Sequence, residues 1–270
     1  MSKRPPKHPK VGLHDFLNSR PLLHALRHGL VETPFNLLID TPSKLADRFS
    51  AGDLDIALIP SIEYARMADA VISPIFCIAS LGKVDTVLLF SELAIEEIQS
   101  VACDPKSRAS AAMLKILFKK VYGKALSTFV GSEKPELMLR AADAGLVIGD
   151  MAFGIDREKY VTQDLGELWF KSFGLPFVHA LLCLKEGQRF DPALAALKQA
   201  KEIGMKNIAL IAKQETDSQE EAERLYKYLA SRIIYDLGEE EIKGLEHFLD
   251  SAKEMGLCGR SDLKFYDEGA

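Results

Sequence analysis

The sequence predicts an α/β protein of two lobes that are joined by a hinge and separated by a cleft. Short apolar runs alternate with segments of helical periodicity over most of the chain, which is typical of strands alternating with helices. A chain of 270 residues is long for one hydrophobic core and suits two. A segment with its own strand–helix rhythm is inserted between two long apolar runs, so that two crossings connect the lobes. We therefore predict lobe I at residues 1–88 plus 184–270 and lobe II at residues 89–183.

The first lobe is predicted to begin with a strand, a loop and a helix. A polar tripeptide separates the first apolar run from Pro21, and proline suits the first turn of a helix because its φ is already fixed. Pro42 opens a second helix, and Pro60-Ser61 opens a short third one. Each helix follows an apolar run, which favours a parallel sheet covered on both faces. The strands predicted in this part span residues 11–14, 35–39, 54–59 and 70–79.

The inserted segment and the C-terminal part differ in their pattern. The inserted segment alternates strands with helices, whereas everything after Asp191 is predicted to be helical. The polar faces of these last helices carry many Glu and Lys residues, which indicates a solvated surface. We therefore expect a helical C-terminal extension. Strands are predicted at residues 84–90, 100–103, 126–130, 145–148 and 177–184, and helices at 105–122, 134–144, 219–237 and 239–255, with a further helix that begins at Pro192.

Composition and charge restrict the class of function. Apolar residues make up 47% and charged residues 27% of the chain, as in a soluble globular protein. The formal net charge is −5 and no basic stripe is visible, which argues against nucleic acid as a partner. No run reaches the ~18 apolar residues needed to cross a bilayer, so a membrane is not expected as a partner either. The first ten residues lack the apolar core of a signal peptide, and we expect a cytoplasmic protein.

The cysteines are far apart and lack CxxC spacing. They are predicted to be small buried hydrophobic residues of a reducing compartment, not disulfides or zinc ligands. The sequence contains no metal-ligand cluster, Walker loop, GxGxxG motif or nucleophile elbow, and we therefore expect no metal and no cofactor. The four residues concerned are Cys77, Cys103, Cys183 and Cys258.

The polar tripeptide Asn18-Ser19-Arg20 lies at the predicted start of the first helix. Backbone N–H groups at a helix start have no partner within the helix, and the helix dipole makes that end positive, so an anion can bind there. Arg20 adds a fixed positive charge with a forked set of donors. This corner therefore suits a small carboxylated ligand. An ordinary helix cap is the alternative.

Six short motifs occur in order between residues 11 and 185. They are NSRPL at 18–22, DIALIPSIEY at 55–64, GKVDTVLLFS at 82–91, SRAS at 107–110, LVIGD at 146–150 and GLPFV at 174–178. The series resembles the chorismate dehydratases of menaquinone biosynthesis. The resemblance implies a type II periplasmic-binding-protein-like fold used as a cytoplasmic enzyme. It also implies dehydration of chorismate to 3-[(1-carboxyvinyl)oxy]benzoate, the first step of the futalosine route.

Two other functions are compatible with the same resemblance. A sister enzyme of that route, 1,4-dihydroxy-6-naphthoate synthase, shares the fold, but its N-terminal pattern differs from residues 18–21. A non-catalytic protein that binds small carboxylates is the other alternative. Transport proteins of this fold carry an export signal, and transcription factors of this fold begin with a DNA-binding helix-turn-helix. Neither feature is visible, which favours an enzyme with a small molecule as its partner.

The resemblance implies roles for residues in the matched motifs. Asn18 is expected to be catalytic, because its amide can donate to the C4 oxygen or a carboxylate of chorismate and its carbonyl can accept from a hydroxyl. Thr86 is also expected at the reacting centre; many members have Ser here, and Thr keeps the hydroxyl but adds a methyl that narrows the pocket. Capping is the alternative role for the Ser and Thr residues and for Asp150, and a surface position is the alternative for Arg108. Substrate binding is assigned to Ser19, Arg20, Ser61, Ser107, Arg108, Ser110 and Asp150.

The reaction that the resemblance implies requires few catalytic groups from the protein. Loss of water makes the ring of chorismate aromatic, so the enzyme has to fix the conformer, help hydroxide leave and arrange proton removal. No Asp or Glu in the matched motifs is an obvious base. We therefore hypothesise that the enolpyruvyl carboxylate of chorismate removes the C3 proton. His14 and His179, each in a predicted strand, are alternative bases or satisfied structural residues.

Overall fold

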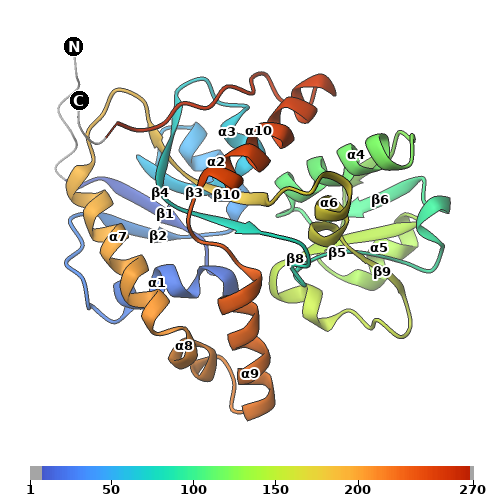
Figure 1. The fold of residues 1–270 in the computed structure, drawn as a ribbon, viewed down its shortest axis with the longest axis horizontal. Helices are drawn as coiled ribbons and strands as arrows, with labels where there is room; N and C mark the ends of the chain where they lie inside the picture. Colours follow the sequence, from blue (N-terminus) through green and yellow to red (C-terminus); the bar gives the residue numbers. More distant parts are fainter. Residues whose placement is uncertain (1–7, 268–270) are drawn as a thin grey trace.

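Each of the two lobes contains one sheet (Figure 1). The computed structural model describes residues 8–267; residues 1–7, on which the export prediction partly rests, lie outside that part. The first sheet has the strand order β2-β1-β3-β10-β4. Its strands are β1 (Lys10–Leu13), β2 (Asn36–Ile39), β3 (Ile56–Pro60), β4 (Ala70–Ser80) and β10 (Phe177–Lys185).

The second sheet belongs to the inserted lobe, which is drawn mostly in green in Figure 1, and has the strand order β7-β6-β8-β5-β9. The predicted α/β class with two lobes is therefore confirmed. The strands of this sheet are β5 (Val87–Ser91), β6 (Ser100–Cys103), β7 (Ser127–Val130), β8 (Ala144–Ile148) and β9 (Val161–Asp164).

Both sheets are mixed, although a parallel sheet was expected. β1 runs parallel to β2 and β3, but β10 pairs antiparallel with β3 and β4. In the second sheet β5 is antiparallel to β8 and β9. β5 and β10 are the strands that the chain enters on arriving from the other lobe. Such a strand starts at the cleft and runs away from it, whereas β3 and β8 end at the cleft, so the pairing has to be antiparallel.

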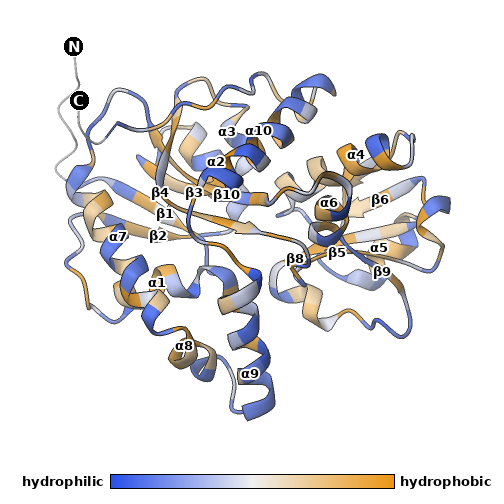
Figure 2. Ribbon diagram, viewed as in Figure 1, coloured by the Kyte–Doolittle hydropathy of each residue, from blue (hydrophilic) through white to orange (hydrophobic). Residues whose placement is uncertain are grey.

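Helices cover the sheets and form the predicted C-terminal extension (Figure 1). α9 is largely hydrophilic, whereas the strands are predominantly hydrophobic (Figure 2). The α-helices are α1 (Arg20–Arg27), α2 (Pro42–Ser50), α3 (Ser61–Tyr64), α4 (Arg108–Val121), α5 (Pro135–Ala141), α6 (Leu165–Phe173), α7 (Asp191–Lys206), α8 (Ile208–Gln214), α9 (Gln219–Lys227) and α10 (Glu239–Glu254). Short 3-10 turns are η1 (Leu17–Ser19), η2 (Ile95–Glu97) and η3 (Gly149–Gly154), and η4 (Tyr228–Arg232) is a π-helical turn.

Several elements depart from the expectations. The region predicted as one helix at residues 219–237 has three parts. It begins as α9, continues as the π-helical turn η4, and then becomes extended, so that Ile234 forms a β-bridge with Ala79. Neither β9 nor α6 was predicted, and the helix expected from Pro192 is followed by a separate α8. Tyr228, the first residue of η4, contacts Thr86 at the end of the first crossing between the lobes.

Two segments cross between the lobes. Residues 81–86 connect β4 to β5, and residues 174–176 connect α6 to β10. The predicted boundary between residues 183 and 184 assigned most of β10 to lobe II, but this strand pairs with β3 and β4 in the first sheet. Residues 87–88, which were assigned to lobe I, lie in β5 of the second sheet. An apolar run shows that a strand is buried, but it does not show which sheet the strand joins.

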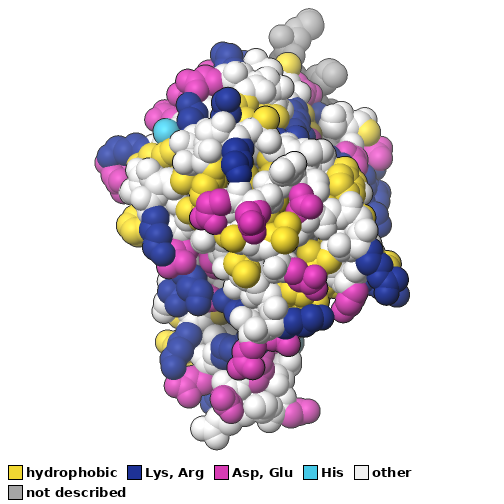
Figure 3. Space-filling view, turned by 90° about the vertical axis from the view of Figure 1, so that its right-hand side faces the viewer, with side chains coloured by type: hydrophobic (Ala, Val, Ile, Leu, Met, Phe, Trp, Pro, Cys, Tyr) yellow, Lys and Arg dark blue, Asp and Glu magenta, His cyan; other side chains and the backbone are white. Residues whose placement is uncertain are grey.

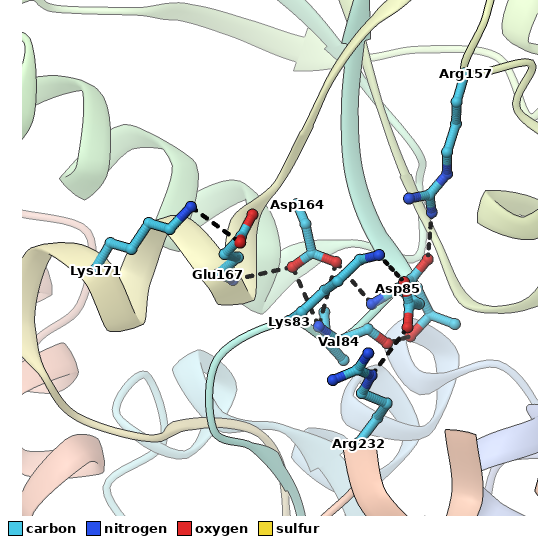
Figure 4. A network of polar contacts seen from close by, with 9 residues as sticks. Lys83, Val84, Asp85, Arg157, Asp164, Glu167, Lys171 and Arg232 are labelled. Carbon is cyan, nitrogen blue, oxygen red and sulfur yellow. Dashed lines mark hydrogen bonds and ion pairs between the residues drawn. The ribbon is translucent and has the colours of Figure 1, made fainter. Parts of the chain in front are cut away.

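A buried carboxyl group links the first crossing to α6, the helix that leads into the second crossing (Figure 4). Asp164 accepts hydrogen bonds from the backbone N–H groups of Val84 at 3.2 Å, Asp85 at 2.7 Å and Glu167 at 3.0 Å. Burial raises the pKa of Asp164. Asp85 has a φ of 67° and is the one non-glycine residue of the described chain with positive φ. Aspartate tolerates this left-handed conformation better than most residues, and the bond to Asp164 holds it there.

An aromatic cluster beside the second crossing packs the inserted lobe against the first. The ring of Trp169 in α6 is fully buried, and its centroid lies 5.1 Å from that of Phe177 in β10 and 6.0 Å from that of Phe248 in α10. Edge-to-face pairs of this kind contribute ~0.5–1.5 kcal/mol beyond their burial. The cluster therefore stabilises the contact between α6 and the C-terminal helix.

The start of α1 is fixed by a close approach of α7. A Cβ atom at Gly204 in α7 would lie 1.7 Å from the carbonyl oxygen of Pro21, so only glycine permits this packing. Pro21 lies in the first turn of α1. The contact therefore positions the residues just before that turn, including Asn18.

On the outer face of the inserted lobe, acidic and basic side chains are interspersed (Figure 3). None of the described helices combines the length and hydrophobicity that a membrane span requires. The cysteines are unpaired, and three of them are buried.

Candidate functional site

A cavity of about 510 Å³, its open mouth included, lies in the cleft between the lobes. Apolar side chains from both lobes form much of its wall, among them Phe16, Ile78, Val84 and Ile148. The polar side chains that line it are His14, Asn18, Thr86, Lys106, Ser107, Ser110 and His179.

On the first lobe, His14 and Asn18 reach the cavity from either end of the loop after β1. The Oγ atom of Ser19 lies 2.8 Å from Nδ1 of His14 and donates to Oδ1 of Asn18 at 3.4 Å. Ser19 is buried and does not line the cavity, so it orients its two neighbours. Burial lowers the pKa of His14 to about 4, and the nearby charge of Asp15 only partly opposes this. His14 is therefore neutral at pH 7.

At the hinge, the hydroxyl groups of Thr86 and Tyr228 meet at 3.0 Å. The Asn18 side chain also hydrogen-bonds to the Tyr228 hydroxyl, and burial raises the pKa of this phenol despite both contacts. Tyr228 comes from η4 in the C-terminal extension. The two residues expected at the reacting centre are thus held together by a third that sequence reasoning missed, and no local motif marks it.

The second lobe contributes the start of α4. Lys106, Ser107 and Ser110 line the cavity there, and Ser107 donates to the carbonyl of Asp104 at 2.6 Å. Among the described residues that line the cavity, Lys106 is the one cationic side chain, and it is only 15% exposed. It lies 3.3 Å from Glu133 and 3.9 Å from the buried Asp104, which partly compensate its charge. The N–H groups at the start of α4 add to the positive character of this wall. The motif SRAS begins at Ser107, so the residue before it, Lys106, was not assigned from the sequence.

His179 reaches the cavity from β10. Its Nε2 atom lies 2.9 Å from Oγ of Ser80 on the adjacent strand β4. Burial lowers the pKa of His179 to about 4, so this ring is also neutral at pH 7. The cavity therefore presents two neutral imidazoles and one cationic amine.

Arg108 was expected to bind substrate, but its guanidinium joins the two lobes instead. It donates to both carboxylate oxygens of Asp47 in α2, at 2.7 Å and 2.8 Å, and lies 3.5 Å from Glu63 in α3. Its pKa is raised, chiefly by the bond to Asp47. Since Arg108 belongs to α4 of the inserted lobe, this bidentate pair closes the cleft from outside the cavity.

Three more of the residues expected to bind substrate also have their contacts outside the cavity. Arg20 pairs with Asp15 and, at 2.9 Å, with Glu215. Ser61 donates to the carbonyl of Val178 at 2.6 Å. Asp150 accepts from the backbone N–H of Leu17 across the cleft at 3.2 Å.

These contacts hold the walls of the cavity in place. Burial raises the pKa of Asp150, although the bond from Leu17 opposes the shift. Capping was the alternative role predicted for Asp150. In the structure this residue lies in the first turn of η3, and Ile148 occupies the cap position. Of the residues assigned from the sequence, the structure brings Asn18, Thr86, Ser107 and Ser110 together around the cavity.

The two neutral histidines predict a pH dependence of stability. The pKa of His14 is about 4 in the folded protein and 6.5 in an unfolded chain, so the unfolded state takes up the proton first. Stability is therefore lost as pH falls from about 6.5 toward 4. Replacing His14 with glutamine, which can still hydrogen-bond to Ser19, removes this contribution.

We expect the free energy of unfolding of His14→Gln to fall less than that of the wild type between pH 7 and about pH 4.5. Urea denaturation at each pH measures the difference, and His179→Gln is expected to change it in the same direction. Equal falls for the wild type and both variants would show that these histidines are not kept neutral by the fold.

Comparison with known proteins identifies relatives of the whole chain. The family described as menaquinone biosynthesis matches residues 9–254. A chorismate dehydratase from Thermus thermophilus is 28% identical, over 92% of this chain and 95% of the relative. A solved structure of a protein from Archaeoglobus fulgidus gives a TM-score of 0.71 at 16% identity and covers 93% of this chain and 98% of that one. The alkanesulfonate-binding protein from Xanthomonas axonopodis pv. citri gives 0.65 at 15% identity, with 97% of each chain covered.

The structural similarity establishes the fold of this chain. The family match adds a coarse statement about its function. The two lobes with mixed five-stranded sheets form a periplasmic-binding-protein-like fold, as the resemblance in the sequence implied. The matched region begins at the cleft strand β1 and extends through α10, so it includes every wall of the cavity. The chain therefore belongs to the menaquinone biosynthesis family.

Proposed function

We propose that this protein is a chorismate dehydratase that forms 3-[(1-carboxyvinyl)oxy]benzoate and water. The family and the dehydratase from Thermus thermophilus support this reaction class. The observation that carries the proposal is the asymmetry of the cavity. One wall is cationic at Lys106, and the facing corner carries the uncharged polar groups of Asn18 and Thr86. Chorismate has carboxylates that fit the cationic wall and a leaving hydroxyl group that fits the uncharged polar corner.

Each wall has a distinct task in this reaction. Lys106 and the start of α4 bind a carboxylate of chorismate, because a cation and free N–H groups both favour an anion. Asn18 donates to the C4 oxygen as its bond to the ring breaks, and Thr86 supports it through Tyr228. The apolar wall at Phe16 and Ile148 excludes water, which strengthens these contacts.

The proton at C3 goes to the enolpyruvyl carboxylate of the substrate. No described residue that lines the cavity is an Asp or Glu. His14 and His179 are neutral, but with pKa values of about 4 they are no stronger as bases than a carboxylate, and the enolpyruvyl carboxylate is already attached through oxygen to C3. Loss of water gives an aromatic ring, so a weak base held close to C3 is sufficient. If His14→Gln or His179→Gln abolished turnover while leaving the fold and chorismate binding intact, a protein base would replace this step.

One assay tests the proposal. Purified protein is mixed with chorismate, and the absorbance of the cyclohexadiene is followed while the product is identified by mass spectrometry. We expect the diene absorbance to disappear and an aromatic product lighter by one water to appear. Binding of chorismate without conversion would favour a non-catalytic carboxylate-binding protein. Absence of binding would favour another enzyme of the same route, such as a 1,4-dihydroxy-6-naphthoate synthase-like protein.

The contact of Arg108 with Asp47 predicts an effect on substrate affinity rather than on chemistry. In Arg108→Gln the bidentate pair across the cleft is lost, and the closed form becomes less stable by ~0.2–1 kcal/mol, the usual value for an exposed pair. We expect KM for chorismate to rise about threefold with kcat unchanged, measured by steady-state kinetics. Lys171→Gln, which breaks a pair with Glu167 within one helix, is the control. A fall in kcat would instead place Arg108 at the reacting atoms.

A further inference from the structure

A second cavity lies beside the hinge, outside the cleft. It has a volume of about 660 Å³ with its open mouth included. Its walls come from the hinge, from the segment after β8 and from the C-terminal extension, which are far apart in the sequence. We call it the hinge pocket. Four cationic side chains and one carboxylate line it: Arg157, Arg224, Lys227, Arg232 and Asp85.

Two aromatic rings complete the lining of the hinge pocket. Phe153 and Tyr228 meet edge to face, with centroids 5.4 Å apart and an angle of 87° between the rings. The guanidinium of Arg224 lies 4.5 Å from the centroid of Phe153. A planar anion therefore has both a ring to pack against and a guanidinium beside it. Tyr228 also separates the two cavities, because its hydroxyl contacts Thr86 in the cleft.

The positive charges of the hinge pocket are only partly compensated. Arg232 lies 3.2 Å from the carboxylate of Asp85, which Lys83 also approaches at 3.0 Å (Figure 4). Arg157 reaches the same residue from the other side, but at its backbone carbonyl and at 3.4 Å. No carboxylate of the described chain lies within ion-pair distance of Arg157.

The remaining two cations have partners on their own helix. Arg224 pairs with Glu221, and Lys227 lies 3.4 Å from Glu223. All four cationic side chains are substantially exposed, so these pairs are weak and a ligand can compete for the donors. The pocket thus holds one carboxylate on its lining and four cations that come from three segments: the chain after η3, α9 and η4.

We propose that the hinge pocket is a second binding site, for a small aromatic carboxylate. Guanidinium groups bind carboxylates through two parallel hydrogen bonds, and Arg157 and Arg224 are placed to supply them, with Lys227 as a further cationic donor on the same lining. The rings of Phe153 and Tyr228 bind the aromatic part of the ligand. The site is separate from the cleft in which we place the reaction, and it requires no turnover to be occupied.

Isothermal titration with isophthalate, a benzene ring with two carboxylates, tests the proposal. We expect two binding events in the wild type, one in the cleft and one in the hinge pocket. Arg157→Gln and Lys227→Gln should each weaken binding in the hinge pocket about tenfold, the effect of losing one charge-assisted hydrogen bond. Lys106→Gln should weaken only binding in the cleft. Lys243→Gln is the matched control, because Lys243 is also exposed and pairs with Glu240 on its own helix.

Two results would overturn the proposal. If Arg157→Gln and Lys227→Gln both left isophthalate binding unchanged, the hinge pocket would not be a carboxylate site. If succinate bound this site as tightly as isophthalate, the rings of Phe153 and Tyr228 would play no part and the preference for an aromatic ligand would be wrong. Neither result depends on whether the protein converts chorismate, which the activity assay reports separately.

Discussion

Replacing Asn18 with alanine is expected to lower kcat for chorismate dehydration about 100-fold, the typical loss when one donor to a developing negative charge is removed. Asn18 lines the cavity and is held by Ser19 and Tyr228, so its amide is already aimed before substrate arrives. A donor positioned in advance acts mainly on the transition state. The loss should therefore be in kcat, with KM changed little.

Steady-state kinetics on the purified variant measures this effect, and thermal unfolding verifies that the fold is retained. Asn36→Ala is the matched control, because Asn36 is an exposed asparagine on β2 away from the cavity. Its kcat should equal that of the wild type. If Asn18→Ala kept more than a third of the wild-type kcat, Asn18 would not be a catalytic donor in this reaction.

The substitution Gly204→Ala is expected to destabilise the protein by ~3 kcal/mol. The added Cβ would lie 1.7 Å from the carbonyl oxygen of Pro21, and a backbone carbonyl in the first turn of a helix cannot move aside as a flexible side chain can. α1 and α7 therefore have to separate. Urea denaturation measures the change in the free energy of unfolding.

Gly154→Ala is the control for this change. Gly154 also lies outside the β-strands, and a Cβ there would meet nothing within 4 Å. This variant should be as stable as the wild type or slightly more stable, since alanine restricts the unfolded chain. If Gly204→Ala had the same small effect, α1 and α7 would not be held together by this contact. A Gly204→Ala protein that folds should also have a reduced kcat, because Asn18 precedes the displaced turn.

Much of the fold could be predicted because its strands and helices follow local rules. The strand at residues 100–103 matches β6 in full, and prolines at 21, 42 and 135 lie in the first turn of α1, α2 and α5. β9 was missed because residues 161–164 combine one apolar side chain with three polar ones. The helix at 219–237 was predicted too long because its last residues are apolar, and only the bridge from Ile234 to Ala79 shows that they are extended.

The candidate site was predictable where it lies at the junction of a strand and a helix. Asn18 and Ser107 both lie just before a helix, where polar groups face the cleft. Tyr228 could not be found in this way, because its contact with Thr86 joins residues 142 positions apart. The position of the Arg108 guanidinium could not be predicted, because a helix start does not determine which way a long side chain turns. In the structure two carboxylates on the other lobe attract it.

The carboxyl group of Asp164 has a consequence for how the molecule opens. It holds the N–H groups of Val84 and Asp85 in one crossing, and that of Glu167 in the helix leading to the other. Breaking these bonds would leave a buried polar group unsatisfied, at a cost of about 1–3 kcal/mol. The lobes are therefore expected to swing as rigid blocks around this fixed pivot, with torsional change confined to residues 81–83 and 174–176.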